Sequence, residues 1–171
     1  MPYIEGSIGP YENAGVPSAG TSEVQTLTFG GTPTGGTFKL EFDGQETAAI
    51  AWNATNNTLR DNVDAALEAL TNIGSGGVTT AVGTMTAGIG TLTITFAGNQ
   101  AALAVNTITV ANNSLAGTDP TLAVEETTAG VTASFRGAKK GALVSDTTNG
   151  VLYINTGTAL APTWTKVGTQ S

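Results

Sequence analysis

The chain has 171 residues, of which 11% are charged, and a formal net charge of −7. It contains no cysteine and no histidine, which excludes disulfides, thiolate chemistry and any imidazole that acts as a base, a metal ligand or a pH switch. The acidic balance argues against nucleic acid, which needs a basic surface. We also expect no membrane span, because no run of about 18 apolar residues occurs, and no signal peptide at the N-terminus.

Residues 1–22 are interpreted as an extended N-terminal docking arm. Gly, Pro and Ser interrupt this segment every few residues, and neither a strand period nor a helix period survives. Such a segment buries too little apolar surface to become ordered alone, so we expect a partner surface to hold it. The alternative is that it packs on its own domain. Its sizeable apolar side chains are the candidate anchors: Tyr3, Ile4, Ile8 and Tyr11.

Residues 23–130 are interpreted as the main domain, which begins with three predicted strands. Alternating apolar and polar residues predict these strands at 23–29, 37–42 and 45–52. A turn is expected between the first two, at GTPTGG (31–36). The second and third strands are joined by Asp43-Gly44, a pair typical of a tight hairpin.

The third predicted strand should direct alternate side chains to the core. These are Ala48, Ile50 and Trp52. The period then changes to that of a helix, with a stripe formed by Leu59, Val63, Leu67, Leu70 and Ile73. Thr55 or Thr58 can cap the start of this helix, and Gly74 is a natural residue for its C-terminal end.

Strand patterns resume after the helix, with a turn signal at Gly98-Asn99. The candidates are residues 78–82, 91–96, 106–110 and 121–126. Three strands, one helix and then several strands indicate an α+β domain that is predominantly β. We expect an antiparallel, sandwich-like domain with one amphipathic helix.

Residues 131–171 are interpreted as a linker and a small C-terminal β-meander of three strands. The strand candidates are residues 141–146, 151–155 and 163–167. Asn149-Gly150 predicts a hairpin between the first two. Asp146–Gly150 also matches a fragment of a calcium loop, but the hairpin explains the same residues. A unit of this size needs a neighbour to be stable.

Charge is distributed unevenly along the chain. Residues 23–130 carry ten acids and two bases, hence −8, whereas residues 131–171 carry four bases and one acid, hence +3. This asymmetry favours electrostatic pairing between the pieces or between subunits. Arg136, Lys139 and Lys140 are therefore candidate partner contacts, and the alternative is that they form a solvated linker.

No motif indicates catalysis. The carboxylate pairs Asp64/Glu68 and Glu125/Glu126 are interpreted as solvated, and the serines have no histidine to activate them. We therefore predict that the protein is not an enzyme and has no catalytic residue, cofactor or metal site. Of the two tryptophans, Trp52 is expected in the core, whereas the environment of Trp164 is left open.

Two segments resemble modules of tailed-bacteriophage virion proteins. The first is EVQTLTFGGTPTGGTFKLEFDGQETAAIAWNATNNTLRDNVDAALEALTNIGSGGVTT, with the continuation through TLTITFAG to TTAGV, and it covers roughly residues 22–131. The second is GALVSDTTNGVLYINTGTALAPTWTKVG (141–168), which is similar to a short meander found in fibre, head-fibre and decoration proteins. These modules bring no active site with them.

The resemblance implies assembly into a virion. A short chain with an arm suits a capsid decoration (cement) protein, which binds the outside of the phage head and stabilises the lattice of the major capsid protein. The resemblance further implies a homo-oligomer, with a trimer favoured, made in the host bacterial cytoplasm and placed on the capsid exterior. The alternative is a tail or head-fibre component that binds host surface glycans, with Trp164 as a glycan contact.

Overall fold

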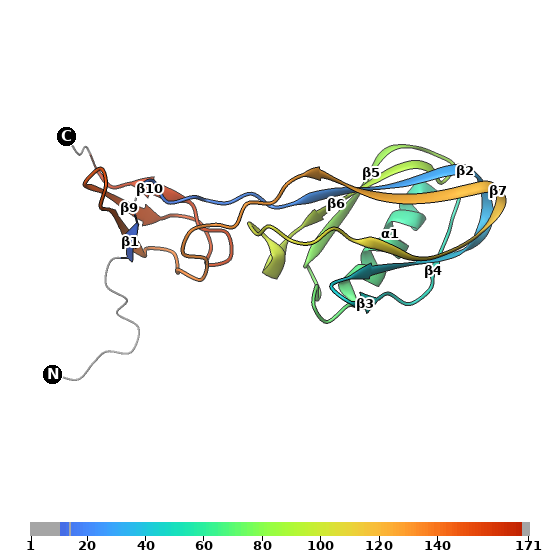
Figure 1. Ribbon diagram of the computed structural model, residues 1–171, viewed down its shortest axis with the longest axis horizontal. Helices are drawn as coiled ribbons and strands as arrows, with labels where there is room; N and C mark the ends of the chain where they lie inside the picture. Colours follow the sequence, from blue (N-terminus) through green and yellow to red (C-terminus); the bar gives the residue numbers. More distant parts are fainter. Residues whose placement is uncertain (1–10, 14, 169–171) are drawn as a thin grey trace.

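The computed structural model describes residues 11–13 and 15–168 (Figure 1). Two β units lie at opposite ends of an elongated molecule, joined by a narrow neck. We call them the large unit (β2 to β7 with α1) and the small unit (β1, β8, β9 and β10). The neck comprises residues 15–22 and 130–136.

The elements follow one another along the chain with these bounds. They are β1 (Tyr11–Asn13), β2 (Val24–Phe42), β3 (Gln45–Glu46), β4 (Ile50–Ala51), α1 (Asn56–Glu68), β5 (Val78–Thr86), β6 (Ile89–Phe96), the short 3-10 helix η1 (Gly98–Gln100), β7 (Thr109–Thr128), β8 (Leu143–Asp146), β9 (Val151–Asn155) and β10 (Trp164–Lys166). The predicted class, predominantly β with antiparallel pairing and one helix, is confirmed.

A long two-stranded ribbon organises the large unit. β2 pairs antiparallel with β7 along nearly its whole length. On its other side the first half of β2 pairs with β6, and the second half pairs with β4 and β3. The ribbon bends sharply at the end far from the small unit (Figure 1). Its two halves therefore enclose a core, in which the rings of Phe29 and Phe38 meet edge to face at 5.3 Å.

The predicted turn at residues 31–36 is wrong, because this segment continues β2 through the bend. Register shifts between Gly30 and Thr32, and between Pro33 and Gly35, turn the strand while its pairing with β7 continues. Gly31 has a φ of +70°, and a Cβ built on it would lie 2.0 Å from the Asp119 carbonyl oxygen. Glycine is therefore required at this position because the bend of the ribbon leaves no room for a Cβ.

The Asp43-Gly44 hairpin is confirmed, but the strand after it is interrupted. β3 and β4 are separated by residues 47–49, and Ala48 is exposed, contrary to the prediction. Thr47 takes the buried position instead: its amide donates to the Leu40 carbonyl at 2.8 Å, and its hydroxyl accepts from the Leu40 amide at 3.1 Å. Ile50 is buried as expected.

Trp52 is half-buried and packs against the core rather than lying within it. Its Nε1 donates to the Gly88 carbonyl oxygen at 3.1 Å. The prediction of a core tryptophan is therefore correct for its ring contact but not for full burial.

Helix α1 ends earlier than its apolar stripe predicts. Leu59, Val63 and Leu67 are buried on the helix, whereas the last two apolar residues of the stripe are buried in the turns that follow it. Thr55 occupies the N-cap position but makes no side-chain cap hydrogen bond. The amide of Gly74 donates to the Leu70 carbonyl at 2.8 Å, so this glycine closes a turn beyond the helix.

Side chains of α1 also bind the backbone of two strands. The Asp64 carboxylate accepts from the Thr80 amide of β5 at 3.0 Å, and the Asn62 side chain donates to the Ala51 carbonyl of β4 at 2.9 Å. The helix thus covers the side of the large unit between β5 and β4. Among the described residues, no helix is long and apolar enough to cross a membrane.

The predicted strands at 106–110 and 121–126 belong to one 20-residue strand, β7, which begins at Thr109. Residues 106–108, just before β7, are not paired in a strand; the buried side chain of Gln25 binds their backbone. The Gln25 side chain accepts from the Ile108 amide at 2.8 Å and donates to the Asn106 carbonyl at 3.0 Å. The predicted turn after Phe96 is present as η1.

The small unit is a four-stranded sheet rather than the predicted three-stranded meander. Its strand order is β1-β8-β9-β10, and β1 pairs parallel with β8. The additional strand comes from the N-terminal segment, so residues 11–13 pack on their own chain. Packing on its own chain was the alternative to a partner surface for the N-terminal segment. Residues 15–22 also bind their own chain, because Ser18 and Thr21 form backbone hydrogen bonds within the neck.

Three chain segments lie together in the neck. The backbones of Thr21 and Val131 exchange two hydrogen bonds at 2.8 and 2.9 Å. The Ser134 amide donates to the Ser18 carbonyl at 2.9 Å. The Ala133 amide donates at 2.9 Å to a carbonyl oxygen of the loop after η1. We therefore expect the neck to hold the two units in a defined arrangement.

Candidate docking surface

The candidate anchors of the arm are only partly placed. Tyr3, Ile4 and Ile8 lie outside the described residues. The backbone of Tyr11 pairs with Val144 at the start of β1, so this residue is part of the small unit. A docking role for these four residues stays a prediction.

The β1 strand is fastened to the small unit by Asp146. This fully buried carboxylate accepts from the Gly15 amide at 3.0 Å, across 131 residues of sequence. The same carboxylate accepts from the amides of Thr148 and Asn149 at 3.0 Å, and from the Asn149 side chain at 2.8 Å. The segment is therefore the predicted hairpin, with its carboxylate engaged by N–H donors.

These contacts predict a dependence on pH. The Asn149 side-chain donor, together with the backbone amides, holds the pKa of Asp146 below its ordinary value of 3.8, while burial acts in the opposite direction. A lowered pKa stabilises the fold at pH above 3.8, and this contribution is lost as the pH falls through the folded-state pKa. The amide resonance of Gly15 should therefore shift as the pH falls below 3.8.

The control for this titration is Asp146→Asn. In that variant the Gly15 amide should already resemble the acid form at neutral pH and should show no titration. A Gly15 resonance that titrates equally in both proteins would contradict the assignment.

A second buried polar residue, Asn155, orders the other end of the small unit. Its side-chain nitrogen donates to the carbonyls of Ala138 at 2.7 Å and Thr158 at 3.3 Å. Its side-chain oxygen accepts from the amides of Gly157 and Thr163, each at 2.9 Å. Asp146 and Asn155, both within the D-T-T-N-G…N-T-G pattern, are therefore structural residues.

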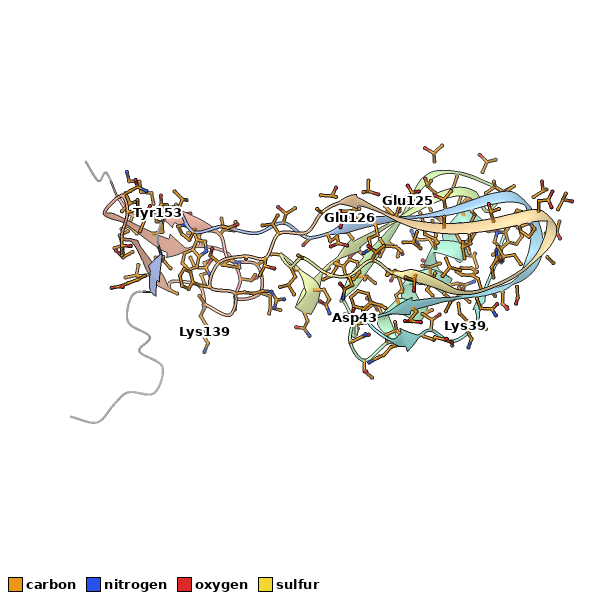
Figure 2. All side chains as sticks on the ribbon, viewed as in Figure 1. Lys39, Asp43, Glu125, Glu126, Lys139 and Tyr153 are labelled. Atoms are coloured by element: carbon orange, nitrogen blue, oxygen red, sulfur yellow. The ribbon has the colours of Figure 1, made fainter. Side chains whose placement is uncertain are left out.

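Arg136 joins the neck to the loop that contains η1 and the residues after it, through hydrogen bonds to backbone carbonyls. Its Nε donates to the Ala101 oxygen at 3.2 Å, and its Nη2 donates to the Asn99 oxygen. This side chain therefore braces the neck and is half-buried. Lys139 and Lys140 are exposed in the following turn, and Figure 2 shows Lys139 projecting from the ribbon.

Trp164 packs within the small unit and its junction with the neck. Its ring lies edge to face on Phe135, with 6.1 Å between centroids, and its Nε1 donates to the Ser134 carbonyl at 3.3 Å. Phe135 reaches this position with a φ of 53°, which is rare outside glycine. These contacts give Trp164 a structural role, and its contact with a glycan stays a prediction.

Large apolar side chains are exposed in the neck and in the small unit. Among the described residues they are Val16, Val131 and Leu143, with exposed fractions of 66%, 48% and 39%. All three belong to the neck or to β8, and none belongs to the large unit. We call these three residues, with Lys139 and Lys140, the candidate docking surface. The apolar part was missed by the sequence analysis, because nothing local distinguishes an exposed valine from a buried one.

Comparison with known proteins adds little. No family model and no curated protein matches the chain. A solved structure from Mycobacterium phage Patience is similar, with 14% sequence identity and a TM-score of 0.43. The match covers 88% of this chain and 57% of that chain, so the present chain spans little more than half of its length. The function is therefore inferred from the residues of this chain.

Proposed function

We propose that the chain is a non-enzymatic virion protein of a tailed bacteriophage, a decoration protein that binds the outside of the head and stabilises the lattice of the major capsid protein. One observation carries this proposal. The two segments that resemble virion modules, residues 22–131 and 141–168, correspond to the large and small units. The first segment thus supplies the large unit, and the second supplies three of the four strands of the small unit, as expected for a chain assembled from structural modules.

The small unit is the end that docks in this proposal. It carries the exposed Leu143, and the neck beside it carries the exposed Val16 and Val131; exposed apolar side chains favour protein contacts. The small unit also carries the exposed Lys139 and Lys140, which favour contact with an acidic partner surface, whereas residues 23–130 carry a net charge of −8. The large unit would therefore project away from the capsid.

Stabilisation of the shell follows from mass action. A protein that binds only the assembled lattice stabilises it by RT ln(1 + [L]/Kd), which is about 2.7 kcal/mol per site when the ligand is at 100 times Kd. Because a capsid offers many equivalent sites, a small gain per site is multiplied over the particle. No chemistry on the shell protein is required.

The test uses empty heads of the phage that encodes the chain. The purified protein should co-sediment with these heads and raise the temperature at which they disassemble. The double variant Val16→Asp/Leu143→Asp should bind at least about tenfold more weakly, because it buries two charges in an apolar contact. The double variant Thr34→Asp/Thr118→Asp, at the far end of the ribbon, adds the same two charges and should bind normally.

Two outcomes would count against the proposal. One is the absence of co-sedimentation, and the other is binding that both variants leave unchanged. Deletion of residues 1–10 tests the arm separately, because it removes Tyr3, Ile4 and Ile8 but leaves β1 in place. Weaker binding by this deletion would support the predicted role of these anchors.

A further inference from the structure

We propose that Asn149 is a modification site, at which the asparagine deamidates slowly and thereby loosens the attachment of strand β1. Asp146 holds this asparagine in its unmodified form, so that conversion is slow in the folded chain. The site lies in the hairpin between β8 and β9, and its chemistry does not depend on the proposed role in a virion.

The Asn149-Gly150 pair has the features that deamidation needs. Glycine adds no side chain that would hinder the approach of its backbone nitrogen to the preceding side chain. Both residues are exposed, and a Cβ built on Gly150 would meet nothing within 4 Å, so water reaches the pair. It is also the only place in the 171-residue sequence where glycine follows asparagine.

The reaction needs only water as a co-reactant. The backbone nitrogen of Gly150 forms a bond to Cγ of Asn149 and gives up its proton, while the bond from Cγ to Nδ2 breaks and the leaving nitrogen departs as ammonia. Water then opens the resulting cyclic imide. Opening at one carbonyl leaves aspartate, and opening at the other leaves isoaspartate. Either product carries a carboxylate in place of the neutral amide.

Asp146 opposes this reaction by binding the group that must react. Its carboxylate accepts from Nδ2 of Asn149 at 2.8 Å and from the backbone amide of the same residue at 3.0 Å. Hydrogen bonds to an ionised acceptor are roughly twice as strong as neutral ones. Asp146 is fully buried, so it cannot follow the side chain outward. We infer that Cγ must turn toward the Gly150 nitrogen before it can react, and that this turn breaks the contact with Asp146.

Conversion removes a hydrogen-bond donor and adds a charge at the same point. The new carboxylate would lie where Nδ2 is 2.8 Å from the Asp146 oxygen, and two carboxylates at this distance repel each other. Asp146 also accepts from the Gly15 amide at 3.0 Å, which fastens the end of β1. The pairing of β1 with β8 covers only three residues. Repulsion at residue 149 should therefore weaken the attachment of β1.

The first experiment measures deamidation in the full chain. Wild-type protein and Asp146→Asn are incubated at mildly alkaline pH, and peptide mass spectrometry locates the mass gain at residue 149. Asp146→Asn should convert there at least about tenfold faster than the wild type, because the charged acceptor is lost. Asp119→Asn is the matched control. It makes the same chemical change at an exposed residue of the ribbon bend, where a φ of 48° suits asparagine, and should leave the rate unchanged.

The fold of Asp146→Asn is checked by amide hydrogen exchange. The Asn155 amide, which donates to the Ala142 carbonyl at 2.8 Å, should stay protected in this variant. A rate at residue 149 that rises only together with loss of this protection would show unfolding of the small unit and would overturn the proposal. Equal rates in the wild type and Asp146→Asn, or conversion in neither, would overturn it as well.

A second pair of variants tests the consequence of conversion without altering Asp146. Asn149→Asp introduces the product carboxylate, so it should shift the Gly15 amide resonance and speed hydrogen exchange in β1. Asn149→Ser keeps a neutral donor and cannot deamidate, so its Gly15 resonance should stay near the wild-type position. Wild-type protein aged until residue 149 is converted should show the same shift as Asn149→Asp. A Gly15 resonance that neither Asn149→Asp nor ageing moves would contradict the proposed release of β1.

Discussion

Replacing Gly31 by alanine should destabilise the large unit by about 3 kcal/mol. The new Cβ would lie 2.0 Å from the Asp119 carbonyl oxygen, which is backbone and cannot rotate away. The φ of +70° adds a cost for any residue with a side chain. Because the bend holds the two halves of the β2–β7 ribbon over the core, the loss should extend to the whole large unit. Urea denaturation followed by tryptophan fluorescence measures it.

Gly44 supplies the control for this substitution. Its φ is +77°, but a Cβ built on it would meet nothing within 4 Å. Gly44→Ala should therefore cost only about 1 kcal/mol, from backbone strain alone. Equal losses for the two variants would show that the bend is not sterically constrained as described.

Replacing Asn155 by alanine should destabilise the small unit by about 3 kcal/mol. The asparagine side chain is buried and makes four hydrogen bonds, so its removal leaves two amides and two carbonyls without partners. The large unit has its own core and should remain folded. Amide hydrogen exchange should therefore become faster across β8, β9 and β10 but stay slow in β2 and β6.

Asn112 provides a matched control, because it is an exposed asparagine in β7. Asn112→Ala should change the stability of neither unit by more than about 0.5 kcal/mol. Unchanged exchange in the small unit of Asn155→Ala would contradict the structural role of Asn155, and faster exchange in both units alike would contradict their independent stability.

Local patterns predicted the parts of the fold that local physics determines. Phe38, Leu40 and Phe42 alternate along β2 and are buried, as the period of two required. The Asp43-Gly44 turn has positive φ at both residues, as its composition predicted. Leu59, Val63 and Leu67 are buried on α1, as the helical period of the apolar stripe predicted.

The bend of the ribbon could not be distinguished from a hairpin by its composition. Glycine and proline at residues 31–36 interrupt a strand in both cases. The difference lies in the partner, since residues 114–121 of β7 continue the pairing through the bend. Those residues are distant in sequence, so no local signal reports them.

The origin of β1 was equally inaccessible to local reasoning. Its pairing with β8 and the hydrogen bond from Gly15 to Asp146 join segments 131 residues apart. In the candidate docking surface, too, some residues could be predicted from the local sequence and others could not. The lysines were expected at a surface because charged side chains are seldom buried, whereas the exposure of Val131 depends on how the neck is assembled.

The most direct test of the proposed function is an image of the virion. Cryo-electron microscopy of wild-type particles and of particles from a phage lacking this gene would locate the chain by difference density. We predict elongated density on the outer surface of the head, absent from the deletion particles, with the small unit against the shell and the large unit projecting outward. Difference density confined to the tail, or none on the particle, would contradict the account.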